Sequence, residues 1–148
     1  MQLTRQTDFG LRILVFLALE NDRLVKLEQI ATAHEISYSH LLKISHRLVE
    51  FGYIQTLRGR RGGVRLAQEP ADIRVGDVIR DLEGQFALAD CMETKANTCR
   101  IAPMCRIRSI YWEALEAFFD ILSRYTIADL AKQRPELRAA LALSTCSS

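Results

Sequence analysis

The chain has 148 residues, of which 49% are hydrophobic and 26% are charged, and its formal net charge is +2. This composition is typical of a folded globular protein of about one domain. No stretch approaches the ~20 consecutive apolar residues that cross a bilayer, and the first residues lack the basic and apolar regions of a secretion signal. We therefore expect a cytoplasmic protein that makes no contact with a membrane.

The positive charge is concentrated in the N-terminal half of the chain. Residues 1–67 contain ten Lys and Arg against six Asp and Glu, a net charge of +4, whereas residues 68–148 contain ten against twelve, a net charge of −2. A basic half suggests a polyanionic partner such as nucleic acid.

Three helices are predicted in the first 50 residues. Apolar residues at helical spacing from Asp8 to Leu19, with Thr7 as the N-cap, predict the first helix. A short helix over 27–34 and a longer one over 38–49 follow, with a sharp break between them at Ile36 and Ser37. Gly52 is well placed to cap the third helix.

A short helix, a tight turn and a second helix are typical of a helix-turn-helix, whose second helix enters the major groove of DNA. We expect base contacts from the polar stripe of the helix over 38–49 and phosphate contacts from two arginines. The alternative is a three-helix core whose polar face is only solvated. The DNA-binding set predicted in these helices is Ser39, His40, Lys43 and His46 for the stripe, with Arg47 and Arg12 for phosphates.

Two short strands, over 53–57 and 64–66, are joined by the glycine-rich segment 59–63 and predict a β-hairpin wing. Like charges this close together repel each other unless an anion lies opposite them, such as phosphate or an A·T-rich minor groove. The alternative is a hairpin tip that is merely solvated. The wing arginines are Arg58, Arg60, Arg61 and Arg65, and we expect the first three to contact DNA.

After a further predicted helix over 73–82, three cysteines occur with the spacing Cys-x7-Cys-x5-Cys: Cys91, Cys99 and Cys105. Cysteines in a reducing compartment are more often metal-bound, catalytic or free than paired. Three thiolates suit an iron-sulfur cluster, with one iron left for another ligand. The alternatives are zinc, which usually has four protein ligands including a closely spaced cysteine pair, and a disulfide with a spare thiol. Cys146 is expected to be a free thiol in the C-terminal tail.

The segment that begins at Ile107 has apolar residues at heptad-like spacing, which we call the seam. This spacing predicts a long helix that packs on its own domain and on the same helix of a second subunit. A homodimer suits DNA, because the winged helix-turn-helix domains of two subunits can contact half-sites one helical turn apart. We call this domain, residues 1–84, the reading head. Thr126 and Asp129 resemble a capping box that begins a short helix, and we expect one or two further helical turns over 136–143. The predicted dimer interface is Ile107, Ile110, Tyr111, Ala114, Phe118, Ile121 and Tyr125.

The predicted fold class is mainly α with a small β wing. A winged helix-turn-helix domain (1–84) is followed by a cysteine-rich cluster-binding loop (85–106), a dimerisation helix with the following short helix (107–134) and a C-terminal tail (135–148). The sequence has no catalytic triad, phosphate loop or paired acids, so we do not expect an enzyme. An electron carrier or thiol redox enzyme is the alternative of another class, but the chain has no Cys-x2-Cys dithiol.

Several of these motifs together resemble the NsrR family of nitric-oxide-sensing repressors, within the broader group that also contains IscR. The likeness covers nearly the whole chain. The residues that carry it are 1–4 (MQLT), 7–12 (TDFGLR), 58–66 (RGRRGGVRL), 73–78 (IRVGDV), 99–106 (CRIAPMCR) and 125–130 (YTIADL).

This resemblance implies a homodimeric repressor whose cluster, 4Fe-4S in preference to 2Fe-2S, holds the protein on operator DNA. Nitrosylation or loss of the cluster would release the DNA. Cys91, Cys99 and Cys105 match the family's three ligands, and Asp8 matches an aspartate that can reach the partner's cluster. IscR-like proteins instead use a histidine at the position of Arg108. The alternative for Asp8 is a carboxylate that stabilises the first helical turn, and the alternative function is an iron- or cluster-status-responsive regulator of the same fold.

Overall fold

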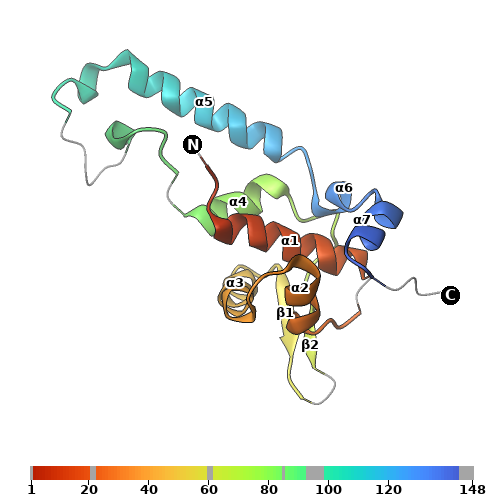
Figure 1. Ribbon diagram of the computed structural model, residues 1–148. Coiled ribbons are helices and arrows are strands. Elements are labelled where there is room, and N and C mark those ends of the chain that lie inside the picture. Colours follow the sequence, from red (N-terminus) through yellow and green to blue (C-terminus); the bar gives the residue numbers. More distant parts are fainter. Residues whose placement is uncertain (1, 21–22, 60–61, 85, 93–98, 144–148) are drawn as a thin grey trace.

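The computed structural model describes residues 2–20, 23–59, 62–84, 86–92 and 99–143 (Figure 1). Its elements confirm the predicted fold class, a mainly helical chain with one small antiparallel sheet. In chain order they are α1 (Arg5–Leu19), α2 (Leu27–His34), α3 (Tyr38–Glu50), β1 (Ile54–Leu57), β2 (Gly63–Leu66), α4 (Val75–Glu83), the 3-10 turns η1 (Asp90–Met92) and η2 (Ala102–Met104), α5 (Arg106–Leu122), α6 (Ile127–Leu130) and α7 (Arg134–Ala140).

Helix α1 lies at the centre of the fold, with α2, α3 and the wing on one side and α4 on the other (Figure 1). Its sequence is apolar around much of its circumference, and Ile13 and Leu14 are fully buried. Gly10 allows a close approach of α4, because a Cβ atom there would lie 2.3 Å from Leu82 Cδ1. The helices of the reading head therefore share one core.

Two helix caps were predicted from the sequence, Thr7 at the start of α1 and Gly52 at the end of α3. The N-cap of α1 is Thr4 rather than Thr7, because the helix begins at Arg5 and the Thr4 side chain accepts the Thr7 N–H; the prediction was wrong by one turn. Gly52 has a φ of +75° after α3, which only glycine adopts freely, and its N–H donates to Val49 O. The predicted glycine cap is confirmed.

The wing is a two-stranded antiparallel hairpin, with Ile54 opposite Leu66 and Leu57 opposite Gly63. Val25, which precedes α2, forms a further bridge to Val64 and ties the wing to the helix-turn-helix. The turn needs glycine at position 62, where a Cβ atom would lie 2.3 Å from the Leu57 carbonyl oxygen.

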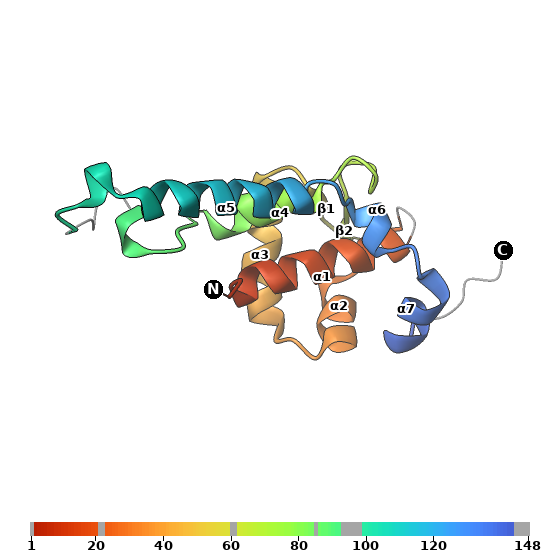
Figure 2. The same ribbon diagram turned by 90° about the horizontal axis from the view of Figure 1, so that it is seen from above.

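Helix α5 runs across α4, and its N-terminal end extends with η1 and η2 away from the rest of the chain (Figures 1 and 2). Leu115 and Phe119 face the reading head and are buried. The Arg80 guanidinium of α4 lies 4.0 Å from the centre of the Phe119 ring. The predicted seam needs one correction: α5 ends at Leu122, so Tyr125 lies beyond the helix.

After α5 the chain returns to the reading head. The predicted capping box is confirmed, with Thr126 and Asp129 bonded reciprocally at the start of α6. Lys132, followed by the backbone and side chain of Thr126, lowers the pKa of Asp129 to about 2. Ile127 is fully buried, and its N–H donates to Ile73 O. The short helix that follows α5 is thus part of the winged-domain core.

Helix α7 then fastens the C-terminal end of α1. Arg134 Nη2 donates to Ala18 O at 2.8 Å, and Arg138 Nη1 donates to Leu19 O at 2.7 Å. Arg138 Nη1 also lies 3.1 Å from Glu20 Oε1, and the Glu20 side chain, which is only 3% exposed, pairs with Arg23 as well. A buried carboxylate is thus held between two guanidinium groups.

We expect Arg138→Met to lower the free energy of unfolding by about 2–4 kcal/mol, because it removes one counter-ion from a buried carboxylate while Arg23 remains. Urea denaturation measures this loss. In the double variant Glu20→Gln/Arg138→Met, part of the stability should return because no buried charge is left. If the double variant is as unstable as the sum of the two single variants, the ion pair is not the cause.

Candidate functional site

The predicted recognition helix α3 presents a polar outer face. Leu41, Ile44 and Leu48 point into the core, whereas Ser39, His40, Lys43 and His46 are all exposed. A groove of about 310 Å³ separates this helix from the wing, and its lining includes Tyr38, Leu42, His46, Thr56 and Leu57. Hydroxyl, imidazole and ammonium groups beside apolar surface are the groups that read base edges and thymine methyl groups.

Arg47, on the same helix, is half-buried and has a different environment. Its guanidinium donates to Leu82 O at 2.7 Å, to Asp81 O at 2.8 Å and to Gln6 Oε1 at 2.8 Å. Three of its hydrogen-bond donors are therefore engaged within the protein. The predicted phosphate contact of Arg47 stays a prediction beside this observed structural role.

The wing contributes one exposed arginine to the described residues, Arg58. Arg65 lies on β2 opposite Gln55 and is half-buried. Arg60 and Arg61, the two predicted contacts at the tip, lie outside the described residues. The described cationic or imidazole side chains of α3 and the wing that remain exposed are thus His40, Lys43, His46 and Arg58.

Asp8 and Arg12 lie on the exposed face of α1 near its N-terminus. Arg12 Nη2 is 2.9 Å from Asp8 Oδ2, and the two side chains are 45% and 50% exposed. An ion pair this exposed adds little to stability. The Asp8 carboxylate therefore remains accessible to a group from outside the subunit.

The three predicted cysteine ligands belong to one excursion of the chain between α4 and α5. Cys91 lies on η1 and is half-buried, Cys99 is exposed, and Cys105 is the N-cap residue of α5. Residues 93–98 lie outside the described part of the chain, as does Cys146. Met92 is buried beside Cys91 and its Sδ accepts the Leu88 N–H at 3.4 Å, which anchors the first arm of the loop.

Among the described residues, no three His, Cys, Asp or Glu side chains lie close enough together to hold a metal ion. The cysteines and Asp8 therefore do not assemble into such a group within one subunit as it stands.

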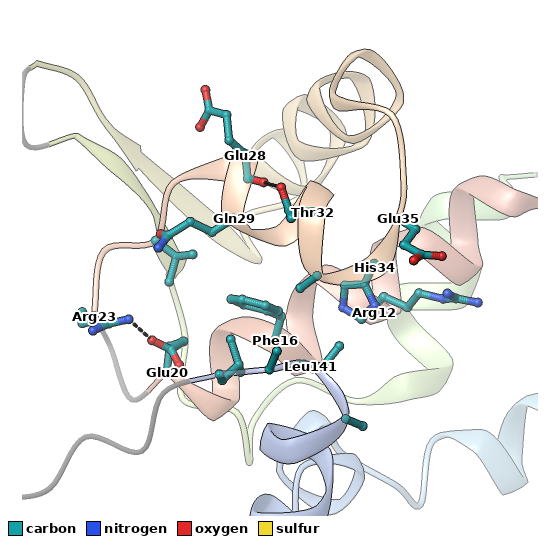
Figure 3. Close-up of a pocket in the computed structure, with 15 residues that line it drawn as sticks. Arg12, Phe16, Glu20, Arg23, Glu28, Gln29, Thr32, His34, Glu35 and Leu141 are labelled. Atoms are coloured by element: carbon teal, nitrogen blue, oxygen red, sulfur yellow. Dashed lines mark hydrogen bonds and ion pairs between the residues drawn. The ribbon is translucent and has the colours of Figure 1, made fainter.

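A pocket of about 970 Å³ lies elsewhere, between α1, α2 and α7 (Figure 3). Arg12 and His34 lie next to each other at one end of it, and the Glu20–Arg23 pair lies at the other. Burial, followed by the nearby Arg12 charge, lowers the pKa of His34. Of the predicted site residues that the structure describes, Arg12 alone lines this pocket.

Helix α5 carries an exposed apolar face. Of the predicted interface, Ile107 and Ile110 are each 44% exposed and Ile121 is 53% exposed, whereas Tyr111 and Phe118 are half-buried against the subunit. Exposed apolar residues that line up along one helix indicate an interaction surface. Trp112, which the sequence analysis did not place in the interface, is 42% exposed on the same helix.

The contacts that converge on the last turn of α4 were not predicted from the sequence. Besides Arg47, the Tyr53 hydroxyl donates to Asp81 Oδ2 at 2.5 Å, and Thr4 N donates to Glu83 Oε1 at 2.7 Å. No local pattern could have found them, because each joins residues far apart in the chain.

Comparison with known proteins agrees with this architecture. The family model Rrf2, described as an iron-dependent transcriptional regulator, matches residues 3–133. The chain is 42% identical over 146 residues to the HTH-type transcriptional regulator NsrR of Shouchella clausii, with 98% of both chains covered. It is 46% identical over 142 residues to NsrR of Geobacillus kaustophilus, covering 95% of this chain and 97% of that protein.

Among solved structures, T. potens IscR matches with a TM-score of 0.72 and 27% identity, covering 92% of this chain and 90% of the other. Within the described ranges, no helix has the length and hydropathy that crossing a bilayer requires. These relatives are regulators rather than enzymes, which agrees with the prediction from the sequence. The chain belongs to the Rrf2 family, as a transcriptional regulator of the NsrR/IscR group.

Proposed function

We propose that this chain is a homodimeric iron-sulfur repressor that binds operator DNA and releases it in response to nitric oxide. One observation carries the proposal: Cys91 and Cys105 stand in the two arms of a single loop, which joins the DNA-reading head to the exposed helix α5. A change at these thiols therefore lies between the surface that reads DNA and the surface that would hold a second subunit. The resemblance to NsrR repressors supports nitric oxide as the signal.

The residues of the loop fit an iron-sulfur cluster. Within the described part of the chain, Cys91 and Cys105 are free cysteines, and the Cys105 side chain makes no capping bond to α5. Arg108 Nε, three residues after Cys105, is buried and has no hydrogen-bond partner among the described residues. A cationic donor suits anionic sulfur ligands. Cys91, Cys99 and Cys105 would hold the cluster, which when bound would supply iron that reacts with nitric oxide.

Asp8 would supply the fourth ligand from the second subunit. Its carboxylate is half exposed on the first turns of α1, where Arg12 holds it at 2.9 Å. Carboxylate is a harder ligand than thiolate and binds iron of a cluster less tightly. Since Asp8 is part of the reading head, this contact would fix the separation of the two recognition helices and so their register with two half-sites.

For the DNA contacts, Ser39, Lys43 and His46 would face base edges, and the wing would lie over the minor groove. His40 and Arg12 would add contacts from the reading head, and Arg58, Arg60 and Arg61 would neutralise phosphates. The exposure of the α3 residues and of Arg58 supports this assignment. Contacts to phosphates make affinity depend steeply on salt, because each one releases counter-ions.

A second function is favoured by one observation, the description of the matching family model as an iron-dependent regulator. In that case the same dimer and loop would respond to iron supply or to the presence of the cluster. The two functions share the fold and differ only in the signal.

The deciding experiment is anaerobic purification with an absorption spectrum and counts of iron and sulfide, followed by titration with nitric oxide. DNA binding is measured on a duplex selected from a random library by the cluster-loaded protein. We expect about four irons per chain and a fall in DNA affinity of at least about tenfold. A colourless protein with one zinc would contradict the cluster, and a cluster that ignores nitric oxide but follows iron supply would favour the second function.

We expect Ile121→Glu to dissociate the dimer, because it places a carboxylate on the exposed apolar face of α5. Sedimentation velocity measures the change in mass, and the helical content of the subunit should stay the same. Ser109→Glu adds the same charge at an exposed polar position of α5 and is the matched control. If both variants remain dimeric, the interface lies elsewhere.

We expect Asp8→Ala to speed the loss of cluster absorbance several-fold in the presence of a chelator, because one iron loses its protein ligand. Arg12→Ala is the matched control, since it breaks the same ion pair and leaves the carboxylate in place. Equal rates in the two variants would mean that the ion pair, rather than ligation by Asp8, protects the cluster.

A further inference from the structure

The last turn of α4 is the point at which three parts of the reading head meet. The Asp81 and Leu82 carbonyls accept hydrogen bonds from Arg47 of α3. The Asp81 carboxylate accepts one from Tyr53, which precedes β1, and Glu83 accepts from Thr4, the N-cap of α1. Three consecutive residues, 81–83, thus bind the start of α1, the end of α3 and the residue that precedes the wing.

The carbonyl groups that Arg47 binds are ones that α4 itself cannot satisfy. The last four carbonyls of a helix have no partner in the next turn, and a cation near them is favoured by the helix dipole. Arg47 supplies both the donors and the charge from another helix. Its guanidinium also lies 5.7 Å from the centre of the Phe51 ring, which holds its plane in place.

The hydrogen bond from Tyr53 to Asp81 also keeps a fixed direction. Burial first, and then the hydrogen bond to Asp81, raise the pKa of Tyr53, so the hydroxyl remains a donor to the carboxylate at any ordinary pH. The Tyr53 side chain is only 7% exposed. The last turn of α4 therefore cannot rotate without breaking hydrogen bonds to α3 and to the wing.

The same turn leads directly into the cysteine loop. Gly84 turns the chain with a φ of +74°, and Cys91 follows seven residues later. Phe86, between them, stacks on Phe118 and meets Phe119 edge-on, at 5.9 and 5.5 Å between ring centres. The first arm of the loop is thus held to α5 by the Phe86 ring and is joined to the end of α4 at Gly84.

We propose that Arg47 is a positioning residue that transmits the state of the cysteine loop to the recognition helix within the same subunit. A shift of residues 86–92, the first arm of the cysteine loop, displaces the last turn of α4. Because the Arg47 guanidinium is hydrogen-bonded to that turn, α3 is displaced with it. Arg47 lies one helical turn after Lys43 and next to His46 in the sequence. This inference rests on the proposed function for its biological role, but the mechanical link between loop and helix does not need a bound cluster.

The first test compares DNA affinity with and without the cluster in wild type and Arg47→Lys. Lysine keeps the charge and the stem but cannot reach two carbonyls and an amide with one fork. We expect the ratio of the two affinities to fall from at least about tenfold toward one, with an unchanged cluster spectrum. Arg5→Lys is the matched control, because Arg5 is exposed and lines a pocket of about 280 Å³ between α1 and α3 that Arg47 also lines.

The outcomes separate this inference from the proposed function. A wild type whose DNA affinity does not depend on the cluster contradicts the proposed function. A wild type that responds, with an Arg47→Lys variant that responds equally, overturns the role of Arg47. If Arg47→Lys instead weakens binding equally in both states, Arg47 acts on DNA binding itself rather than on its response to the cluster, which also overturns it.

A second test needs no cluster. Phe86→Ala releases the first loop arm from α5, and hydrogen-deuterium exchange is measured over residues 45–50 of α3. We expect faster exchange of these amides in Phe86→Ala than in wild type, and no further change when Phe86→Ala is added to Arg47→Lys. Exchange in α3 that does not respond to Phe86→Ala would overturn the link.

Discussion

The burial of α1 on most sides is the constraint on which the rest of this structure depends. The helix contacts α2, α3, α4, α6 and β2, and α7 binds its last carbonyl groups. A helix in this position cannot move without disturbing the elements packed on it. Because Asp8 lies on its one exposed stretch, a ligand that holds Asp8 acts on a rigid body rather than on a flexible arm.

The elements of the reading head could be predicted because their signals are local. The apolar spacing of α1 and α3, the glycine after α3 and the Thr126 capping box each specify one element, and the structure has all of them. The Thr7 cap was misplaced because two threonines stand three residues apart, and both could begin a helix. The seam was extended to Tyr125 because periodicity alone does not reveal that a helix has ended.

The candidate site was predictable only in part. The cysteines and the polar stripe of α3 could be found because residue type and spacing identify them. The roles of the arginines could not, since a sequence counts charge but does not show what each charge faces. Arg23 pairs with Glu20, Arg12 with Asp8, and Arg47 binds the end of α4. Three of the ten basic residues of the N-terminal half are therefore engaged within the subunit.

The return of α6 and α7 to the reading head has a consequence for how the protein is made. Synthesis proceeds from the N-terminus, yet Ile127 fills the core beside Ile73, and Arg134 and Arg138 bind α1 across 116 and 119 residues of chain. Contacts so distant in sequence form late and slowly. A nascent chain in which α3 has already left the ribosome still lacks part of its core. The DNA-reading domain is completed only after the cysteine loop and α5 have left the ribosome.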